Sequence, residues 1–193
     1  MPNWCTNVVN ITHDDITQLE RARDAFARGE FLQEFIPCPQ SLRDTAATHY
    51  PEGHADKAAH DALVAENVKQ HGFANWYDWQ VSHWGTKWDF GDEDGADLNG
   101  DVLSLSFDSA WAPPCDAYDR LEDLGFRIEA YYYEPGMAFC GSWINGVDSC
   151  IDIPGTSAEA EQVIPTEIDE MFGIVENMIQ WEEDEAAWEA ESE

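Results

Sequence analysis

The chain has 193 residues and a formal net charge of −31, because 40 Asp and Glu face only nine Lys and Arg. Apolar residues make up 44% of the sequence and nine are Trp, so the chain can bury a sizeable core, which argues against global disorder. Nucleic acids and anionic membranes repel so negative a surface, which argues against both as direct partners.

The negative charge is concentrated in the second half of the chain. From Ile128 onward, 66 residues contain 17 Asp or Glu and no Lys or Arg, whereas the first 87 residues contain 12 acids and seven bases. An asymmetric charge distribution of this kind gives information about binding partners rather than about the fold. It predicts attraction to basic surfaces, including those with which proteins hold nucleic acid.

The first half of the chain predicts one strand and two helices, followed by an aromatic segment. Residues 3–12 alternate as in a strand, and a helix with N-cap chemistry at its start is expected to run to about Arg28 before Gly29. A short apolar run over 31–36 ends at Pro37, and residues 40–51 are expected as a loop. The next segments are a second helix over 56–71 and the aromatic stretch 73–90.

The second half predicts an acidic turn, a strand, a helix, a hairpin and a terminal helix. These segments are residues 92–101, residues 102–108, the helix that starts after Pro113-Pro114 and ends near Gly125, the hairpin strands 127–133 and 137–145, and the amphipathic helix from about Pro165. Beyond Trp181 nearly all residues are acids or Ala, so we expect a fraying tail.

The order of elements indicates an α+β fold, ferredoxin-like in outline, with an antiparallel sheet and helices on one face. Residues 1–164 are expected to form this domain, with a helical and aromatic insertion at about 40–90. Residues 165–193 are expected to form an acidic C-terminal helix and tail.

The cysteines and the N-terminus predict a cytoplasmic protein in a host cell cytosol. Five Cys without a C-x-x-C pair indicate reduced thiols, and no apolar run approaches the ~20 residues that span a bilayer.

Several tryptophan-rich segments resemble the YubB-type ferredoxin-like family of phage and plasmid proteins. They are Met1-Pro2-Asn3-Trp4-Cys5 with Asn7, Pro37-x-Pro39, Asn75-Trp76-Tyr77-Asp78-Trp79, Trp84-Gly85-Thr86-Lys87-Trp88-Asp89, the segment 107–114, and Tyr132-Tyr133-Glu134-Pro135-Gly136 with Phe139-x-Gly141. The resemblance covers nearly the whole chain. It implies a ferredoxin-like fold and a mobile-element origin, without an iron–sulfur cluster and without catalytic residues that could be carried over.

The acid-rich segments are the principal candidate site. We expect a non-enzymatic protein that binds and blocks a basic nucleic-acid-handling host protein by nucleic-acid mimicry, and a role against host defence belongs to the same expectation. The expected contact residues are Asp92, Glu93, Asp94, Asp97 and Asp101 on the turn, and Glu182, Glu183, Asp184 and Glu185 near the end.

The aromatic segment offers an alternative, a small-molecule or nucleotide binding protein or an enzyme that uses an aromatic pocket. Its candidate residues are Trp76, Trp79, Trp84, Lys87, Trp88 and Asp89. Trp faces can stack on a base while a Lys meets phosphate. The competing interpretation is structural: the Trp rings fill the core and Lys87 pairs with Asp78 or Asp89.

No cofactor or metal site is expected from the sequence. The acidic turn has Phe90 where an EF-hand loop ending at Asp101 needs its first ligand, and no His and Cys spacing fits zinc. A nucleophilic Cys115 or Cys140 beside His83 is formally possible, although no local motif marks a reactive thiol.

Overall fold

The computed structural model describes residues 3–92 and 95–192. Within these ranges six strands form one sheet: β1 (Trp4–Thr12), β2 (Ala96–Asn99), β3 (Val102–Ala110), β4 (Arg127–Glu134), β5 (Phe139–Ile144) and β6 (Val147–Asp152). The helices of the first half are α1 (Ile16–Ala27), α2 (Phe31–Phe35), α3 (Gln40–Arg43), α4 (Lys57–His71) and α5 (Trp76–Trp84). Those of the second half are α6 (Cys115–Asp123), α7 (Ser157–Val163), α8 (Thr166–Phe172) and α9 (Ile174–Ser192).

The sheet has the strand order β2-β3-β1-β4-β5-β6, and each neighbouring pair is antiparallel. Strand β1 lies between β3 and β4, which are joined through α6. The four strands β2-β3-β1-β4 therefore have the split β-α-β arrangement of a ferredoxin-like fold. The α+β class with an antiparallel sheet and a C-terminal helix is therefore confirmed. Strands β5 and β6 extend the sheet on one side.

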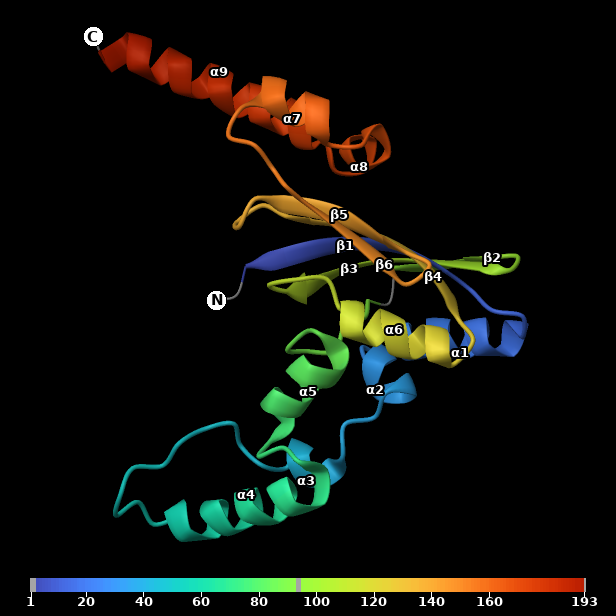
Figure 1. The fold of residues 1–193 in the computed structure, drawn as a ribbon, viewed down its shortest axis with the longest axis vertical. Helices are drawn as coiled ribbons and strands as arrows, with labels where there is room; N and C mark the ends of the chain where they lie inside the picture. The colour runs from blue at the N-terminus through green and yellow to red at the C-terminus, as the bar shows by residue number, and fades with distance from the viewer. Residues whose placement is uncertain (1–2, 93–94, 193) are drawn as a thin grey trace.

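One face of the sheet packs on α1 and α6, with α2 and α5 beyond them (Figure 1). Alternate residues of the strands point into this first core, because side chains in a strand face opposite sides in turn. The largest fully buried aliphatic residues here are Ile11, Leu19, Leu32, Leu42, Leu103 and Leu121. Helix α1 starts where the Asp15 carboxylate accepts a hydrogen bond from the Thr17 N–H.

On the opposite face of the sheet, α7, α8 and α9 pack over β4, β5 and β6 (Figure 1). A second core lies here, in which Ile164, Ile168 and Ile174 are buried against Cys140, with Tyr131 and other half-buried residues around them. The expected single C-terminal helix is divided because Gly173, with a φ of 63°, ends α8 in the left-handed region. The expected tail is helical as far as Ser192.

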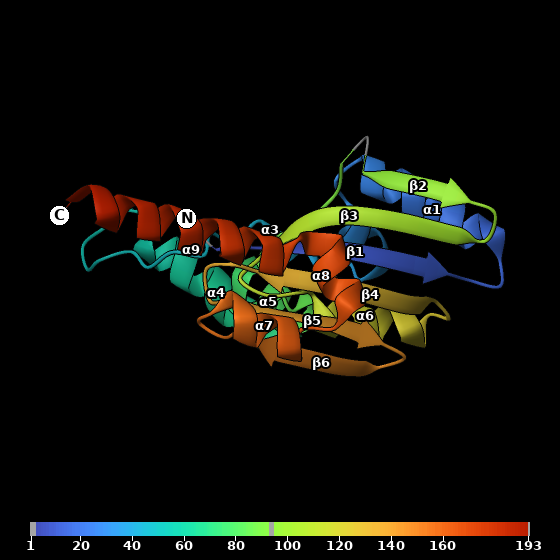
Figure 2. The same cartoon turned by 90° about the horizontal axis from the view of Figure 1, so that it is seen from above.

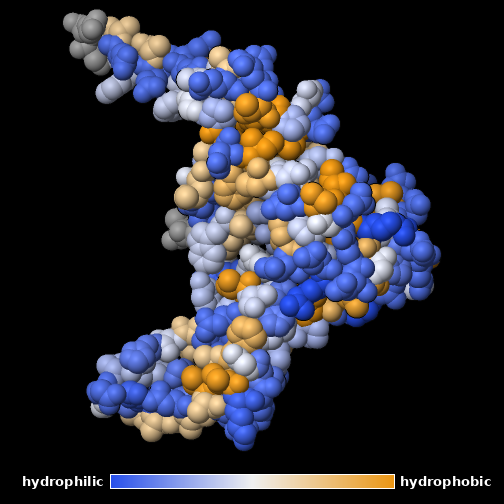
Figure 3. All heavy atoms as spheres, in the orientation of Figure 1, coloured by the Kyte–Doolittle hydropathy of each residue, from blue (hydrophilic) through white to orange (hydrophobic). Residues whose placement is uncertain are grey.

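Two segments project from the body at opposite ends. The α3–α4 insertion extends away from the α1 side, and the C-terminal half of α9 extends beyond the sheet on the other side (Figures 1 and 2). In the space-filling view both projections are mostly hydrophilic (Figure 3). Among the described residues, no helix combines the length and apolar character needed to cross a membrane.

Candidate protein-binding surface and aromatic groove

The basic residues are absent from the last third of the chain. All nine precede Ile128, on α1, α3, α4, α6, β4 and the loops between them, so β5, β6 and the layer α7–α9 carry none. Six of the nine are engaged in ion pairs with nearby acids: Arg21, Arg23, Arg28, Lys57, Lys69 and Arg127. The layer α7–α9 therefore presents acidic side chains that no base within it compensates.

Helix α9 is anchored at its start and exposed at its end. Ile174 is buried and Met178 is half-buried in the second core, whereas all residues from Glu183 to Ala190 are exposed. Trp181 and Trp188 have 63% and 71% of their surface exposed. Seven residues are about two helical turns, so these two Trp lie on the same side of α9. We call residues 181–190 the α9 end.

Glu182 differs from its acidic neighbours because it ties α9 to α7. Its two carboxylate oxygens accept hydrogen bonds from the Ser157 N–H and from Ser157 Oγ, each at 2.7 Å. These bonds lower the pKa of Glu182, since they favour the ionised form. Of the four acids predicted near the C-terminus, Glu183, Asp184 and Glu185 therefore remain exposed for a partner, and Glu182 positions the helix.

The acids predicted on the turn lie at the other end of the molecule. Asp97 on β2 and Asp101 in the β2–β3 turn are exposed, and Asp92 lines a groove described below. Glu93 and Asp94 lie outside the described residues. Both ribbon views place the β2–β3 hairpin and the α9 end far apart (Figures 1 and 2). The structure therefore does not bring the two predicted acidic clusters together.

Three of the predicted pocket residues lie in or against the first core. Trp84 is 1% exposed and donates from Nε1 to the Ile36 carbonyl oxygen at 2.9 Å. Trp79 is buried with its ring stacked on His83, the ring centres 4.0 Å apart. Trp76 packs against the same core. These rings fill space, as the structural interpretation of the aromatic segment expects.

Lys87 pairs with aromatic rings. Its Nζ lies 4.2 Å from the ring centre of Trp88, 5.6 Å from that of Tyr77 and 5.7 Å from that of Trp111. Within the described residues Lys87 has no ion pair, so the expected pairing with Asp78 or Asp89 is not present. Its ammonium is held by cation–π attraction instead.

Asp89 holds the start of α2. Its carboxylate oxygens accept hydrogen bonds from the backbone N–H groups of Leu32 at 2.7 Å and Gln33 at 2.8 Å. Burial raises the pKa of Asp89 from 3.8 to about 6, against the opposing effect of these hydrogen bonds. Asp89 is thus a positioning residue for the loop that leads from α5 to β2.

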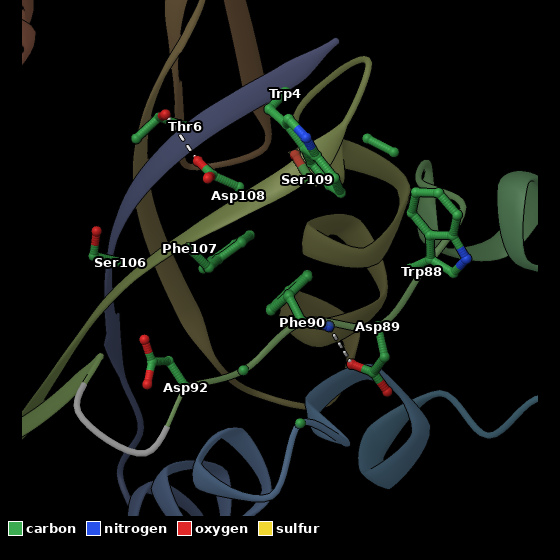
Figure 4. Close-up of a pocket in the computed structure, with 13 residues that line it drawn as sticks. Trp4, Thr6, Trp88, Asp89, Phe90, Asp92, Ser106, Phe107, Asp108 and Ser109 are labelled. Carbon is green, nitrogen blue, oxygen red and sulfur yellow. Dashed lines mark hydrogen bonds between the residues drawn. The ribbon is translucent and has the colours of Figure 1, made fainter. Parts of the chain in front are cut away.

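A groove of about 740 Å³ lies between that loop and the outer edge of β3. Figure 4 shows the side chains of Phe90 and Phe107 next to each other. These rings are buried and stacked with centres 3.7 Å apart, so they form its floor. Trp4 and Trp88 close one end with ring centres 5.9 Å apart. We call this site the β3-edge groove.

The sequence analysis missed several residues of this region, among them Trp4, Phe107, Asp108 and Trp111. In the fold, Trp4 and Trp111 have 46% and 42% of their surface exposed. Exposure depends on the tertiary fold, so a sequence of nine Trp does not reveal which are outside.

The thiols considered as nucleophiles are not activated. Burial raises the pKa of Cys115 to about 12 and that of Cys140 to about 11, so both are protonated near neutral pH. His83 stacks on Trp79, and its Nδ1 donates a hydrogen bond to the Trp79 carbonyl oxygen at 2.9 Å rather than to a sulfur. Within the described residues no group of three or more His, Cys, Asp or Glu could hold a metal ion.

Comparison with known proteins assigns no family. No family model matches the chain, and no curated protein matches it. Among solved structures, the protein Api92 from Yersinia pseudotuberculosis, described with the family model DUF1281, is similar with 14% identity over 80% of this chain and 99% of that one. Its TM-score is 0.40, and so low a similarity carries no argument about fold or function.

Proposed function

We propose that this protein is a non-enzymatic acidic binding protein that occupies the basic surface of a nucleic-acid-handling protein. The observation that carries the proposal is the α9 end, an exposed helix with acids and two Trp on a layer without bases. A role in blocking a host protein, and the phage or plasmid origin that the family resemblance implies, belong to the same proposal.

The charge spacing of α9 supports mimicry of nucleic acid. Seven of its 19 residues are Asp or Glu and none is Lys or Arg. At 1.5 Å per residue the helix is about 28 Å long, so it carries about one negative charge per 4 Å. One strand of duplex DNA carries one charge per about 3.4 Å. A basic groove that fits a phosphate backbone therefore meets a similar linear charge on α9.

The charge of α9 is unfavourable to the isolated helix, which also supports a partner. Acids near a helix C-terminus are destabilised by the negative end of the helix dipole, and acids three or four residues apart, such as Glu182 and Glu185, repel each other. A cationic partner would relieve both effects. The exposed rings of Trp181 and Trp188 add an apolar contact of the kind that dominates many protein interfaces.

The test is capture of host proteins on the immobilised protein at low salt, followed by displacement with duplex DNA. At a salt concentration that has already washed abundant basic proteins off the immobilised protein, we expect duplex DNA to release one nucleic-acid-binding protein. Release of only abundant basic proteins, all lost at about 0.15 M salt, would show that the attraction is generic.

Removing the two exposed aromatic rings tests whether binding depends on a specific interface or on charge alone. Replacing Trp181 and Trp188 by Ala leaves the net charge unchanged and removes no buried side chain, so the thermal midpoint should stay the same. We expect the double variant to bind the captured protein at least tenfold more weakly, about 1.4 kcal/mol. Unchanged binding, measured by calorimetry, would remove the rings from the interface.

A further inference from the structure

The β3-edge groove contains an open edge of the sheet. Strand β1 pairs with β3 along its whole length, Trp4 with Ala110 through Thr12 with Val102. On the other side β2 pairs only with the first part of β3, Val102–Leu105. One further bond joins the Ser106 N–H to the Gly95 carbonyl oxygen at 3.0 Å. Beyond Ser106 the outer edge of β3 has no neighbouring strand in the described part of the chain.

The peptide groups of Asp108 point out of this edge. Successive residues of an antiparallel strand direct their N–H and C=O groups to opposite sides. The Ser106 N–H points outward to Gly95, and the Ala110 N–H is bonded outward to Thr86 Oγ1 at 3.2 Å. Asp108, midway between them, therefore also faces outward. Among the described residues its N–H has no hydrogen-bond partner. This edge is a template for one more extended segment.

The opposite wall of the groove is fixed in place. Asp89 is bonded to two backbone N–H groups of α2. Gly91 lies so close to the end of α1 that a Cβ on it would overlap the Phe26 carbonyl oxygen and approach Gly29. The backbone of the loop is therefore held against α1 and α2, while Phe90 packs on Phe107 of β3. The groove beside this contact has a volume typical of sites for short ligands.

The charge of the groove selects a cation. Its lining residues include Asp92 and Asp108, both exposed, and Asp89, whose carboxylate is bonded to α2. One oxygen of Asp108 accepts a hydrogen bond from Thr6 Oγ1 at 2.8 Å, and the other has no partner among the described residues. The rings of Trp4 and Trp88 close one end of the same groove. The Trp88 ring makes a cation–π contact with the ammonium of Lys87.

We propose that the β3-edge groove receives an extended, positively charged peptide segment, which adds to the sheet beside Asp108. The backbone of the segment pairs with the outward N–H and C=O of Asp108. A residue directly opposite Asp108 has its Cβ about 5 Å away, so an Arg or Lys there meets the carboxylate and the Trp rings. This site is separate from the α9 end and does not depend on the function proposed for it.

The test uses the full chain labelled with ¹⁵N and the probe acetyl-Thr-Val-Arg-Val-Thr-amide. We expect saturable shifts of the Asp108 amide signal below about 5 mM peptide, and slower hydrogen exchange of that amide. The same peptide with Glu in place of Arg should bind about tenfold more weakly. Arginine methylamide, which has the cation but no strand, should leave the exchange of the Asp108 amide unchanged.

Two variants separate the charge from the strand pairing. Asp108→Asn should weaken the Arg peptide severalfold, while Asp101→Asn, with the same charge change outside the groove, should not. Asp108→Pro removes the outward N–H without removing a bond to β1, so it should abolish binding. No shift of the Asp108 amide, equal binding of the Glu peptide, or equal protection by arginine methylamide would overturn the proposal. Neutralising the α9 end should leave peptide binding unchanged.

Discussion

Asp89 shows how one buried carboxylate both orders the groove wall and makes stability depend on pH. Its pKa is raised from 3.8 to about 6 in the fold, chiefly because it is buried. A carboxyl with a raised pKa binds its proton more tightly in the folded state, so the folded state loses stability as the pH rises from about 4 to above 6. Two pH units correspond to about 3 kcal/mol at most.

The variant Asp89→Asn tests this, because an amide keeps one acceptor oxygen and does not ionise. We expect the wild type to lose about 1–3 kcal/mol of unfolding free energy relative to the variant between pH 4.5 and 7.5. Urea unfolding at both pH values measures the difference, in which the general effect of the net charge largely cancels. A difference that stays constant, or that grows in favour of the wild type, would contradict the cause assigned to the shift.

Trp111 carries backbone strain at the rim of the aromatic cluster. Its φ is 69°, in a region that costs L residues about 1–2 kcal/mol and that glycine adopts freely. Trp111→Gly should therefore be about 1 kcal/mol more stable than Trp111→Ala, since both lose the ring and only the alanine keeps the strain. Thermal unfolding of the two variants decides this, and equal stability would mean that the strain is absent in solution.

At the scale of elements, Glu182 determines how firmly α9 is held. Replacing it by Ala removes the two bonds to Ser157, so amide exchange of Ser157 and of the α9 end should accelerate. The exposed neighbour Glu183→Ala is the matched control and should leave exchange unchanged. The pKa of Glu182 is lowered, so this contribution is present above its ordinary value of 4.5 and is lost as the pH falls through the lower folded value. Slow exchange that survives in Glu182→Ala would show that α7 packing alone holds α9.

Elements with a strong local pattern could be predicted, and those that depend on a neighbour could not. Strand β1, helix α1 and strand β3 follow from alternation and caps in the sequence. Strand β2 was missed because Asp97 and Asn99 disfavour strands, and it forms only by pairing with β3. Strand β6 did have a signal: Asn145-Gly146 is a hairpin dipeptide, and both residues have positive φ here.

The candidate sites were predictable only in part, for the same physical reason. The acids of the α9 end could be identified from composition, because charge without compensation is visible in the sequence. The β3-edge groove could not. It arises because the short β2 ends before Asp108, so that among the described residues no strand lies outside Asp108, and because Asp89 holds a loop that is distant in sequence. Trp84 and Trp88 are close in sequence but lie in the core and on the surface respectively, at 1% and 39% exposure.

At the scale of the whole molecule, the charge of −31 opposes folding. Screening shortens the range of the repulsion from about 30 Å at 0.01 M salt to about 3 Å at 1 M. The thermal midpoint should therefore rise by several degrees between these concentrations of NaCl. A variant with Glu183, Asp184 and Glu185 neutralised as Gln, Asn and Gln should show a smaller rise. A midpoint that falls with salt would mean that ion pairs outweigh the repulsion.

The central claim is that the α9 end, rather than total charge, binds the basic partner. The most direct measurement compares the affinity of the captured partner for two triple variants of equal charge. One neutralises Glu183, Asp184 and Glu185, and the other neutralises the exposed acids Glu20, Asp119 and Asp123 of α1 and α6 on the opposite face of the sheet. We predict at least tenfold weaker binding and a shallower salt dependence for the first variant alone. Equal losses in both variants would contradict the account.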